Sequence, residues 1–413
     1  MEEPVSLRTA SFGGYKKEDV LEVLDQINEI IQQLEKGYIS KKLALVRVSE
    51  IKGNFRDAIF NGFVKEDVQI YLKSLAEKIK NYEEPVQEPP EIKSKFTALG
   101  LSGSGKTCFM TGMYYKMSGG IGGYTLKADD DNDVKLTRYY ENIQDNSKGF
   151  DRFPDGTDQT AKYIFDLQYV YKHIADFEWT DYRGNILTEK KSGNPEEYEQ
   201  LKKDIYESDM LYIFVDGAVF DETESYTEND FCEIVVDKCA RYINHFISDY
   251  TKVNKQLPPI AIIVTKYDIV VQNILKMVKQ PTNEAVQAKL NEIIRKSFST
   301  LFPDTSKYGG GVGYTSMTAV IPVSLGAEIS HDDYKGKLKP LNMHIPVFMG
   351  AWLALYRQLK KGDLSKELEI YTENALSMLE SEIEESGISL YLDGQTSSIR
   401  RLAEGYFERS KGL

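Results

Sequence analysis

Two stretches near the N-terminus carry apolar side chains at alternating spacings of four and three residues. The apolar positions are Val20, Leu24, Ile27, Ile31 and Leu34 in the first stretch and Val68, Leu72, Leu75 and Ile79 in the second. This spacing lines the side chains up along one narrow stripe of a helix, as in the seam of a short coiled coil. A helix with so narrow an apolar face needs a partner, inside this chain or on another chain.

The two helices belong to a repeat. Residues 12–20 recur as residues 60–68, and Leu24 then matches Leu72. Each copy has an aromatic residue and a glycine in a turn, followed by acidic residues that suit the positive end of a helix dipole. The pattern predicts a helical domain over residues 1–82, built from a duplicated motif.

The pattern changes after residues 83–94, which are rich in Pro and Glu and predict a semi-extended linker. Short apolar runs at 96–99, 260–264 and 319–323 then predict buried strands, and helical patterns alternate with them. This alternation predicts an α/β domain over residues 95–361, with a doubly wound, mostly parallel sheet. Residues 362–413, with an amphipathic pattern at 364–384, predict a C-terminal helical extension.

Composition narrows the functional classes. The chain has 413 residues, 41% of them hydrophobic, and 51 Lys and Arg against 64 Asp and Glu give a net charge of −13. This charge disfavours a nucleic-acid partner. Three cysteines form no disulfide framework, and no apolar run approaches the ~20 residues of a bilayer crossing, so we expect a cytoplasmic protein.

The acidic run at 129–133 is expected to be a solvated loop.

Residues 95–107 combine an apolar run, a Gly-rich turn and the start of a helix. Gly100, Gly105, Lys106 and Thr107 fit the P-loop spacing G-x-x-x-x-G-K-[ST]. Such a loop turns backbone N–H groups inward around an anion, and the helix adds the positive end of its dipole. The sequence therefore predicts a phosphate-binding loop, in which Lys106 reaches the terminal phosphates and Thr107 holds Mg²⁺.

Later strand ends carry motifs that select the nucleotide. Asp181 and Gly184 form Asp-x-x-Gly after the apolar segment 177–180, which places a carboxylate near Mg²⁺ and a glycine N–H near the terminal phosphate. Asp268, after the strand at 260–264, can accept two hydrogen bonds from N1–H and the exocyclic amine of guanine, a donor pair that adenine lacks. The set therefore favours guanine.

The base-side motif has further members. Thr265 and Lys266 precede Asp268, and the stem of Lys266 is expected to lie along the base. Ser324 and Leu325 follow the strand at 319–323, where a backbone N–H can meet the guanine carbonyl oxygen.

In this order the motifs resemble the set found in Ras-like, translation-factor-related P-loop GTPases, over about residues 95–361. The resemblance implies GTP or GDP with Mg²⁺ as ligands and assigns Asp181 to the second shell of the metal, Gly184 to γ-phosphate sensing and Asp268 to the base. The expected nucleotide-binding set is Gly100, Ser102, Gly103, Ser104, Gly105, Lys106, Thr107, Cys108, Thr265, Lys266, Asp268, Ser324 and Leu325.

The resemblance also implies a threonine that closes over Mg²⁺ and the γ-phosphate and lets go after hydrolysis. Thr160 or Thr157 fits, because both precede the strand expected at 163–169. Asn185 stands where the family often has the longer Gln that orients the attacking water, which predicts slow hydrolysis. Arg183 either stabilises transition-state charge or forms a surface ion pair. The expected catalytic set is Lys106, Arg183, Gly184 and Asn185, and the metal set is Thr107, Thr157, Thr160 and Asp181.

Residues 6–35 resemble the N-terminal segment of the bacterial DivIVA-like family, which has an aromatic-Gly-Tyr turn before a helix that opens on Val. The resemblance implies a parallel coiled coil, self-association and, in some members, peripheral membrane attachment through the turn, where Phe12 lies with Arg8 upstream. It is also the basis for expecting a bacterial protein. The alternative is a small helical bundle that caps the next domain, in which the two copies pair within one chain.

Two functional classes remain open from the sequence. One is a GTPase that acts as a molecular switch, hydrolysing GTP slowly to GDP and controlling the helical arms or a partner protein. The other is a non-enzymatic, oligomerising scaffold that binds guanine nucleotide as a structural element.

Overall fold

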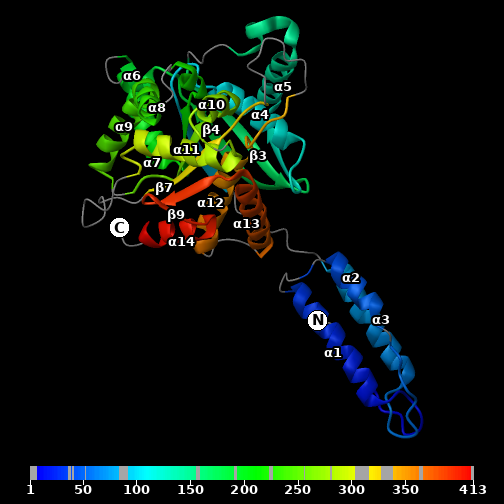
Figure 1. Ribbon diagram of the computed structural model, residues 1–413. Helices are drawn as coiled ribbons and strands as arrows, with labels where there is room; N and C mark the ends of the chain where they lie inside the picture. The colour runs from blue at the N-terminus through cyan, green and yellow to red at the C-terminus, as the bar shows by residue number, and fades with distance from the viewer. Residues whose placement is uncertain are drawn as a thin grey trace. The chain divides into compact units, whose positions relative to one another are not determined.

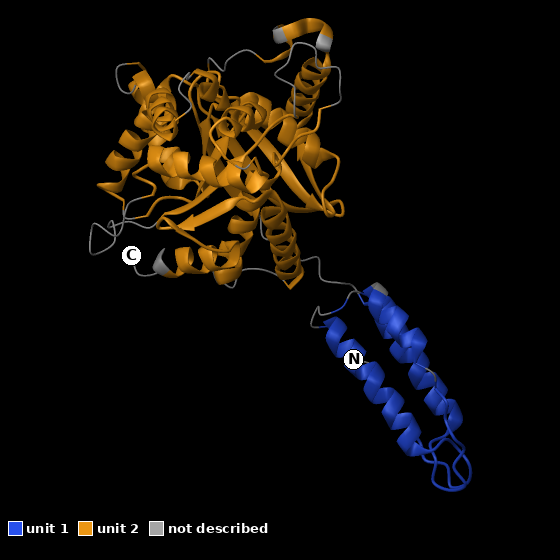
Figure 2. Cartoon of the chain, viewed as in Figure 1, with its two compact units in different colours: residues 1–89 blue, residues 90–413 orange. Residues whose placement is uncertain are grey.

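The computed structural model describes residues 7–35, 39, 41–51, 53–82, 92–154, 159–189, 193–222, 227–254, 256–279, 281–302, 316–326, 338–361 and 366–410. The chain divides into two compact units, unit 1 (1–89) and unit 2 (90–413) (Figure 2). Of the expected linker 83–94, residues 83–91 lie outside the described residues. Lys93 and Ser94 differ from the expectation, because they begin the first strand and Ser94 is buried there.

Unit 1 contains three helices, α1 (Lys17–Glu35), α2 (Lys41–Glu50) and α3 (Lys65–Asn81). The stripe of α1 that the spacing predicts is buried, together with Val68, Leu75 and Ile79 of α3 and Ala44 of α2. The two copies of the repeat therefore bury their apolar stripes in one shared core, inside one chain.

The segments that precede α1 and α3 pair with each other through matched hydrogen bonds. The amide of Tyr15 donates to the carbonyl of Phe63, and that of Phe63 to Tyr15, both at 2.9 Å. Arg8 binds Asp67 of the other copy, and Arg56, 48 positions after Arg8, binds Asp19 in the same way. The positive partner lowers the pKa of each carboxyl to about 2. The two turn-and-helix copies of unit 1 thus pair through reciprocal contacts, and α2, which has no counterpart, lies between them in the sequence.

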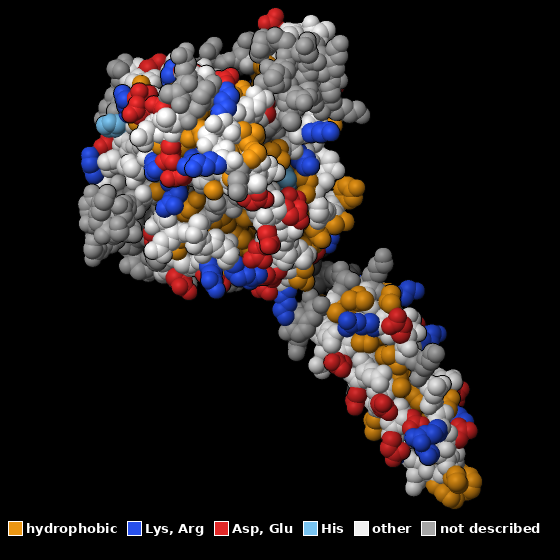
Figure 3. All heavy atoms as spheres, viewed as in Figure 1, with side chains coloured by type: hydrophobic (Ala, Val, Ile, Leu, Met, Phe, Trp, Pro, Cys, Tyr) orange, Lys and Arg blue, Asp and Glu red, His pale blue; other side chains and the backbone are white. Residues whose placement is uncertain are grey.

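One end of unit 1 exposes apolar side chains, seen as a group of hydrophobic spheres in Figure 3. Phe12 is 76% exposed and Phe60 is 60% exposed, and their rings meet edge to face with centroids 4.7 Å apart. These are matching positions of the two copies, so the repeat places its two most exposed aromatic residues side by side.

Unit 2 is a mixed α/β structure built on one nine-stranded sheet, with the order β2-β3-β4-β1-β5-β6-β7-β8-β9 (Figure 1). The strands are β1 (Lys93–Leu99), β2 (Tyr124–Ala128), β3 (Ala161–Tyr169), β4 (Lys172–Asp181), β5 (Met210–Val215), β6 (Ile260–Val264), β7 (Met317–Pro322), β8 (Ser389–Leu392) and β9 (Gln395–Thr396). The five central strands from β4 to β7 are parallel, and β2, β3, β8 and β9 are antiparallel to their neighbours.

Helices cover both faces of this sheet, as Figure 1 shows. They are α4 (Lys106–Ser118), α5 (Asp130–Gln144), α6 (Ile186–Glu189), α7 (Pro195–Glu207), α8 (Glu228–Val235), α9 (Arg241–Thr251), α10 (Tyr267–Leu275), α11 (Asn283–Ser297), α12 (Ile345–Lys361), α13 (Lys366–Ser386) and α14 (Ile399–Ser410). Short 3-10 turns lie at Asn146–Arg152 and Gly217–Glu222, and a π-helical turn, Val236–Ala240, joins α8 to α9.

Strand β5 shows why both faces are covered. Met210, Tyr212 and Phe214 belong to one core, with α4, α12 and α13. The alternate residues Leu211, Ile213 and Val215 belong to a second core, with α7 to α11. Because successive side chains of a strand point to opposite faces, an apolar run without alternation requires helices on both sides.

Two segments differ from the sequence expectation. The C-terminal segment 362–413, expected as a helical extension, also contributes β8 and β9, and β8 extends the main sheet beside β7. In β8, Leu390 belongs to one core of unit 2 and Tyr391 to the other. Two apolar residues are too short a pattern to predict a strand from the sequence. The acidic run at 129–133 is not a loop: Asp129 caps α5 by accepting from the amide of Asn132, and the remaining acidic residues form its first turn.

We predict that Gly14→Ala opens the paired turns of unit 1 and that Gly13→Ala does so much less. A Cβ on Gly14, at φ +90°, would lie 2.5 Å from the carbonyl oxygen of Phe63, whereas one on Gly13, at φ +76°, would meet nothing within 4 Å. The first change therefore combines backbone strain with a clash, about 2–4 kcal/mol, and the second carries strain alone, about 1–2 kcal/mol.

Hydrogen exchange in the full chain measures this difference. Peptides that contain Tyr15 and Phe63 should lose amide protection in Gly14→Ala and largely keep it in Gly13→Ala. Equal protection in the two variants would contradict the pairing.

Candidate functional site

The loop between β1 and α4 is closed around three glycines. Gly103 and Gly105 have φ of +79° and +83°, which glycine adopts without strain. A Cβ on Gly100 would lie 2.6 Å from Oγ of Ser104 and 2.8 Å from Cβ of Phe214. A side chain would therefore clash at Gly100 and strain the backbone at Gly103 and Gly105, and α4 begins directly after the loop, at Lys106.

Lys106 is a buried cation at the start of α4. Its Nζ donates to the carbonyl oxygen of Gly100 at 2.9 Å and lies 4.0 Å from Oδ1 of Asp181. The side chains of Lys106 and Asp181 are 6% and 2% exposed, and burial lowers the pKa of Lys106. A buried charge needs such compensation, and a multiply charged anion would supply more of it.

The Asp-x-x-Gly segment lies directly against this loop. Asp181 is the last residue of β4 and is in register with Ala98 of β1, one residue before the end of that strand. A Cβ on Gly184 would lie 2.1 Å from the backbone nitrogen of Ser102. The backbones of the two segments therefore lie in close contact, with no room for a side chain at Gly184.

The segment after β6 also contacts the loop. Oγ1 of Thr265 donates to the carbonyl oxygen of Ser104 at 2.9 Å. The backbone of Lys266 is in the left-handed conformation. Its Nζ lies 2.8 Å from Oδ1 of Asp216 and 3.3 Å from the carbonyl oxygen of Gly103. Asp268 follows in the first turn of α10. Thr265 and Lys266 thus brace the loop from the side on which Asp268 lies.

A cavity of about 500 Å³ lies over the loop and these strand ends. Its lining includes the expected residues Ser102, Gly103, Ser104, Gly105, Lys106, Thr107, Cys108, Thr265, Lys266, Asp268, Ser324 and Leu325. Gly100 is buried and is not part of the lining. Burial raises the pKa of the Cys108 thiol to about 11, so this residue lines the cavity as a neutral thiol. The structure therefore brings together residues 102–108, 265–268 and 324–325, which are far apart in the sequence.

Sequence reasoning missed part of the lining. Phe153, Pro154, Ala218 and Met343 also border the cavity, together with Phe109, Ile269 and Val323. Phe153 and Pro154 follow a 3-10 turn, and Met343 lies just before α12. No motif marks these positions, because they contribute apolar surface rather than a fixed chemical group.

The expected switch and catalytic residues outside the loop do not line the cavity. Thr160 donates from Oγ1 to Oε1 of Glu197 at 2.6 Å, and Nε of Arg183 donates to Oε2 of the same carboxylate at 2.7 Å. Asn185 is exposed, and its carbonyl accepts from the amides of Thr188 and Glu189 in α6. Thr157, the alternative switch threonine, lies outside the described residues.

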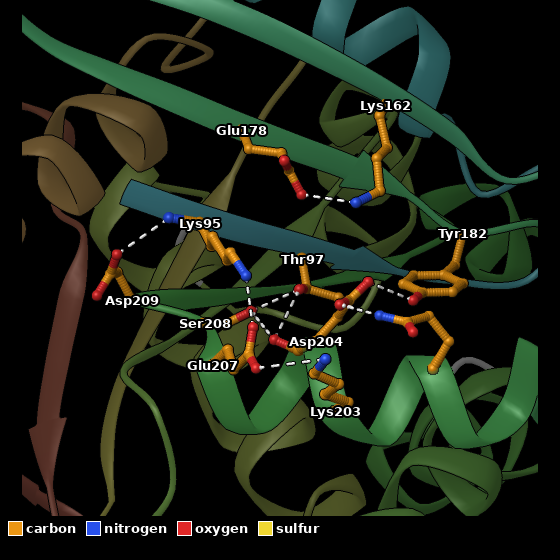
Figure 4. Close-up of polar contacts among 11 residues, drawn as sticks. Lys95, Thr97, Lys162, Glu178, Tyr182, Lys203, Asp204, Glu207, Ser208 and Asp209 are labelled. Carbon is orange, nitrogen blue, oxygen red and sulfur yellow. Dashed lines mark hydrogen bonds and ion pairs between the residues drawn. The ribbon is translucent and has the colours of Figure 1, made fainter. Parts of the chain in front are cut away.

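Helix α7 fixes the segment 181–184 through a second contact, shown in Figure 4. The hydroxyl of Tyr182 donates to Oδ2 of Asp204 at 2.6 Å, inside the core. Ser208, just after α7, donates to the carbonyl of Asp204 and is hydrogen-bonded to Thr97 of β1 (Figure 4). Tyr182 is thus tied to α7, and α7 is tied to the strand that leads into the loop.

Among the described residues, one group of three side chains has the spacing of a metal site. Asp166, His173 and Asp176 of the β3–β4 hairpin bring their ligand atoms within 4.8 Å of one another. Nδ1 of His173 is hydrogen-bonded to Oδ1 of Asp166 at 2.6 Å. On the flanking strands, Lys127 is in register with Asp166 and Lys93 with Asp176, so positive side chains neighbour both carboxylates. The oxygen groups beside the loop, Thr107 and Asp181, remain the better candidates for Mg²⁺.

No described helix has the length and apolar character of a membrane span. No protein-family model matches the chain, and no curated protein matches it. Among solved structures, the chain is similar to the GTP-bound Ski7 GTPase-like domain of S. cerevisiae, with a TM-score of 0.32 and 16% sequence identity. The match covers 60% of this chain and 48% of that chain, about half of its length.

We predict that Tyr182→Phe destabilises unit 2 by about 1–3 kcal/mol, because it leaves one oxygen of the buried Asp204 carboxylate without its donor. Tyr206→Phe, on the same helix but 68% exposed, is the matched control and should change stability by less than about 0.5 kcal/mol. Chemical unfolding followed by fluorescence measures both. Equal stability of the two variants would show that the Tyr182 contact does not hold α7.

Proposed function

We propose that unit 2 binds a guanine nucleotide with Mg²⁺ and hydrolyses GTP slowly, as a molecular switch of the Ras-like P-loop class. The observation that carries this proposal is the convergence of four strand-end segments at one edge of the sheet. Three of them line a cavity large enough for a nucleotide, and the fourth, 181–184, lies against its loop. In a parallel sheet the carboxyl ends of the strands are where ligands bind.

The phosphate side of the proposed site has matching chemistry. Lys106 supplies a buried positive charge, and the start of α4 adds backbone N–H groups and the helix dipole. Mg²⁺ would be held by the oxygen groups of Thr107 and Asp181 and would neutralise charge on the β- and γ-phosphates. Gly184, in backbone contact with Ser102, would sense whether the γ-phosphate is present.

The base side supports guanine. Asp268, Lys266, Ser324 and Leu325 border the same cavity as the loop. A carboxylate at Asp268 can accept from both donors on the Watson–Crick edge of guanine, and adenine has no such pair. Nζ of Lys266 is occupied by Asp216, which leaves its alkyl stem to pack against the ring.

Asp268→Asn tests this assignment. By calorimetry on the full chain, wild type should bind GTP and GDP and bind ATP much more weakly. The variant should lose about a hundredfold in GTP affinity, because two charge-assisted hydrogen bonds are weakened. It should gain affinity for xanthosine triphosphate, whose carbonyl replaces the exocyclic amine. Asp249→Asn, at an exposed position of α9, is the control. Equal binding of ATP and GTP by wild type would contradict the proposal.

Turnover should be slow in the purified protein. Asn185 is exposed and away from the cavity, and the charge of Arg183 is compensated by Glu189 and Glu197, so neither is positioned to assist water attack. Phosphate release under single-turnover conditions measures this rate. Rapid turnover without a partner, unchanged by Asn185→Ala, would overturn it.

The alternative proposal is a scaffold that holds guanine nucleotide as a structural element while unit 1 mediates assembly. It is favoured by the exposed pair Phe12 and Phe60, and opposed by the pairing of the two repeats within one chain, which occupies their apolar stripes. Retained GDP without turnover, together with a stable oligomer by mass measurement, would support the scaffold over the switch.

A further inference from the structure

Glu197 of α7 holds two groups of the proposed switch at once. Its Oε1 accepts from the hydroxyl of Thr160, just before β3, and its Oε2 accepts from the guanidinium of Arg183, just after β4. Arg183 also pairs with Glu189 at 2.7 Å. Burial alone would raise the pKa of Glu197, but these two contacts outweigh it and the pKa is lowered, so the carboxylate is charged at neutral pH.

The holding residue is rigidly placed. Glu197 is in the first turn of α7, where the side chain of Asn194 caps the helix by accepting from the Glu197 amide at 3.2 Å. The other end of α7 is fixed by the contacts of Asp204 with Tyr182 and of Ser208 with Thr97. Thr160 and Arg183 are therefore bound to an element that cannot follow them toward the cavity without breaking buried contacts.

Thr160 and Arg183 lie outside the cavity lining, although Phe153 and Pro154, shortly before Thr160, belong to it. A ligand that requires Thr160 at the metal must first separate it from Glu197. The free energy needed to separate Thr160 from Glu197 weakens the binding of such a ligand. It does not affect a ligand that binds while Thr160 stays on Glu197.

We propose that Glu197 is a latch that holds Thr160 and Arg183 away from the nucleotide and thereby lowers the affinity for GTP relative to GDP. This inference rests on the proposed function. In the proposed function, GTP bound with Mg²⁺ would require Thr160 at the metal, whereas GDP would not. Opening the latch also releases the charge of Arg183 from Glu197. Glu197 is thus a positioning residue that sets how readily the switch turns on.

Glu197→Gln tests the latch, because it keeps the size of the side chain and removes its charge. In the full chain with Mg²⁺, a GTP analogue that is not hydrolysed should bind about tenfold more tightly, the size expected for one charge-assisted hydrogen bond, and GDP affinity should stay within about twofold. Glu196→Gln, the exposed neighbour on the same helix, makes the same charge change and should alter neither affinity.

A second variant separates the two held groups. Glu189→Gln weakens the other ion pair of Arg183 and leaves the Thr160 hydrogen bond intact, so the ratio of GTP to GDP affinity should change by less than about twofold. An equal gain in Glu189→Gln would assign the effect to Arg183 and overturn the role of Thr160. Thermal unfolding of each variant verifies that the fold is retained.

The possible failures are distinguishable. If wild type binds guanine nucleotides but Glu197→Gln leaves the ratio unchanged, weakens GTP, or tightens GTP and GDP equally, the latch is wrong and the proposed function stands. If wild type binds neither GTP nor GDP, the proposed function is wrong and the latch falls with it.

Discussion

The buried ammonium group of Lys106 is the constraint around which the strand-end edge of unit 2 is arranged. A charge in this position is tolerated only with oxygen partners close by, and the fold supplies the carbonyl of Gly100 and the carboxylate of Asp181. These partners come from the loop after β1 and from the end of β4, so one charge links the ends of two strands that already pair through their backbones. Thr265 braces the same loop from β6. Lys106 thus joins the loop after β1 to the end of β4, while Thr265 joins it to the end of β6.

Helix α7 gives this edge its second level of organisation. Its C-terminal half is fixed to Tyr182 and to β1 through buried hydrogen bonds, and its first turn holds Thr160 and Arg183 through Glu197. The contacts with Tyr182 and β1 are inside the core. The contacts of Glu197 with Thr160 and Arg183 are partly exposed and can be replaced by hydrogen bonds to water. One helix therefore combines a permanent anchor with a contact that is easier to break, which is the arrangement that a two-state element needs.

The α/β class of unit 2 and the grouping of the loop with residues 265–268 and 324–325 could be predicted because short-range rules govern them. The spacing of the loop glycines indicates the backbone conformation of the loop. An unbroken apolar run such as Ile260–Val264 indicates a strand that is buried on both faces of the sheet. The role of Glu197 could not be predicted, since its partners lie 37 and 14 residues away and only the fold brings them together. The same holds for β8, whose four residues become a strand only beside β7, and for Met343 at the cavity. Long-range pairing leaves no local signal in one sequence.

Joining the two halves of unit 1 in one chain has an evolutionary consequence. In a homodimer every substitution appears twice, and any change at the two-fold axis must be compatible with its own copy. Here Gly13 corresponds to Asn61 and Ser11 to Ile59, so the two copies have already diverged in sequence, while the reciprocal backbone hydrogen bonds between Tyr15 and Phe63 are kept. The pairing is also independent of protein concentration. A duplicated motif fused in this way is free to specialise one half while the other maintains the fold.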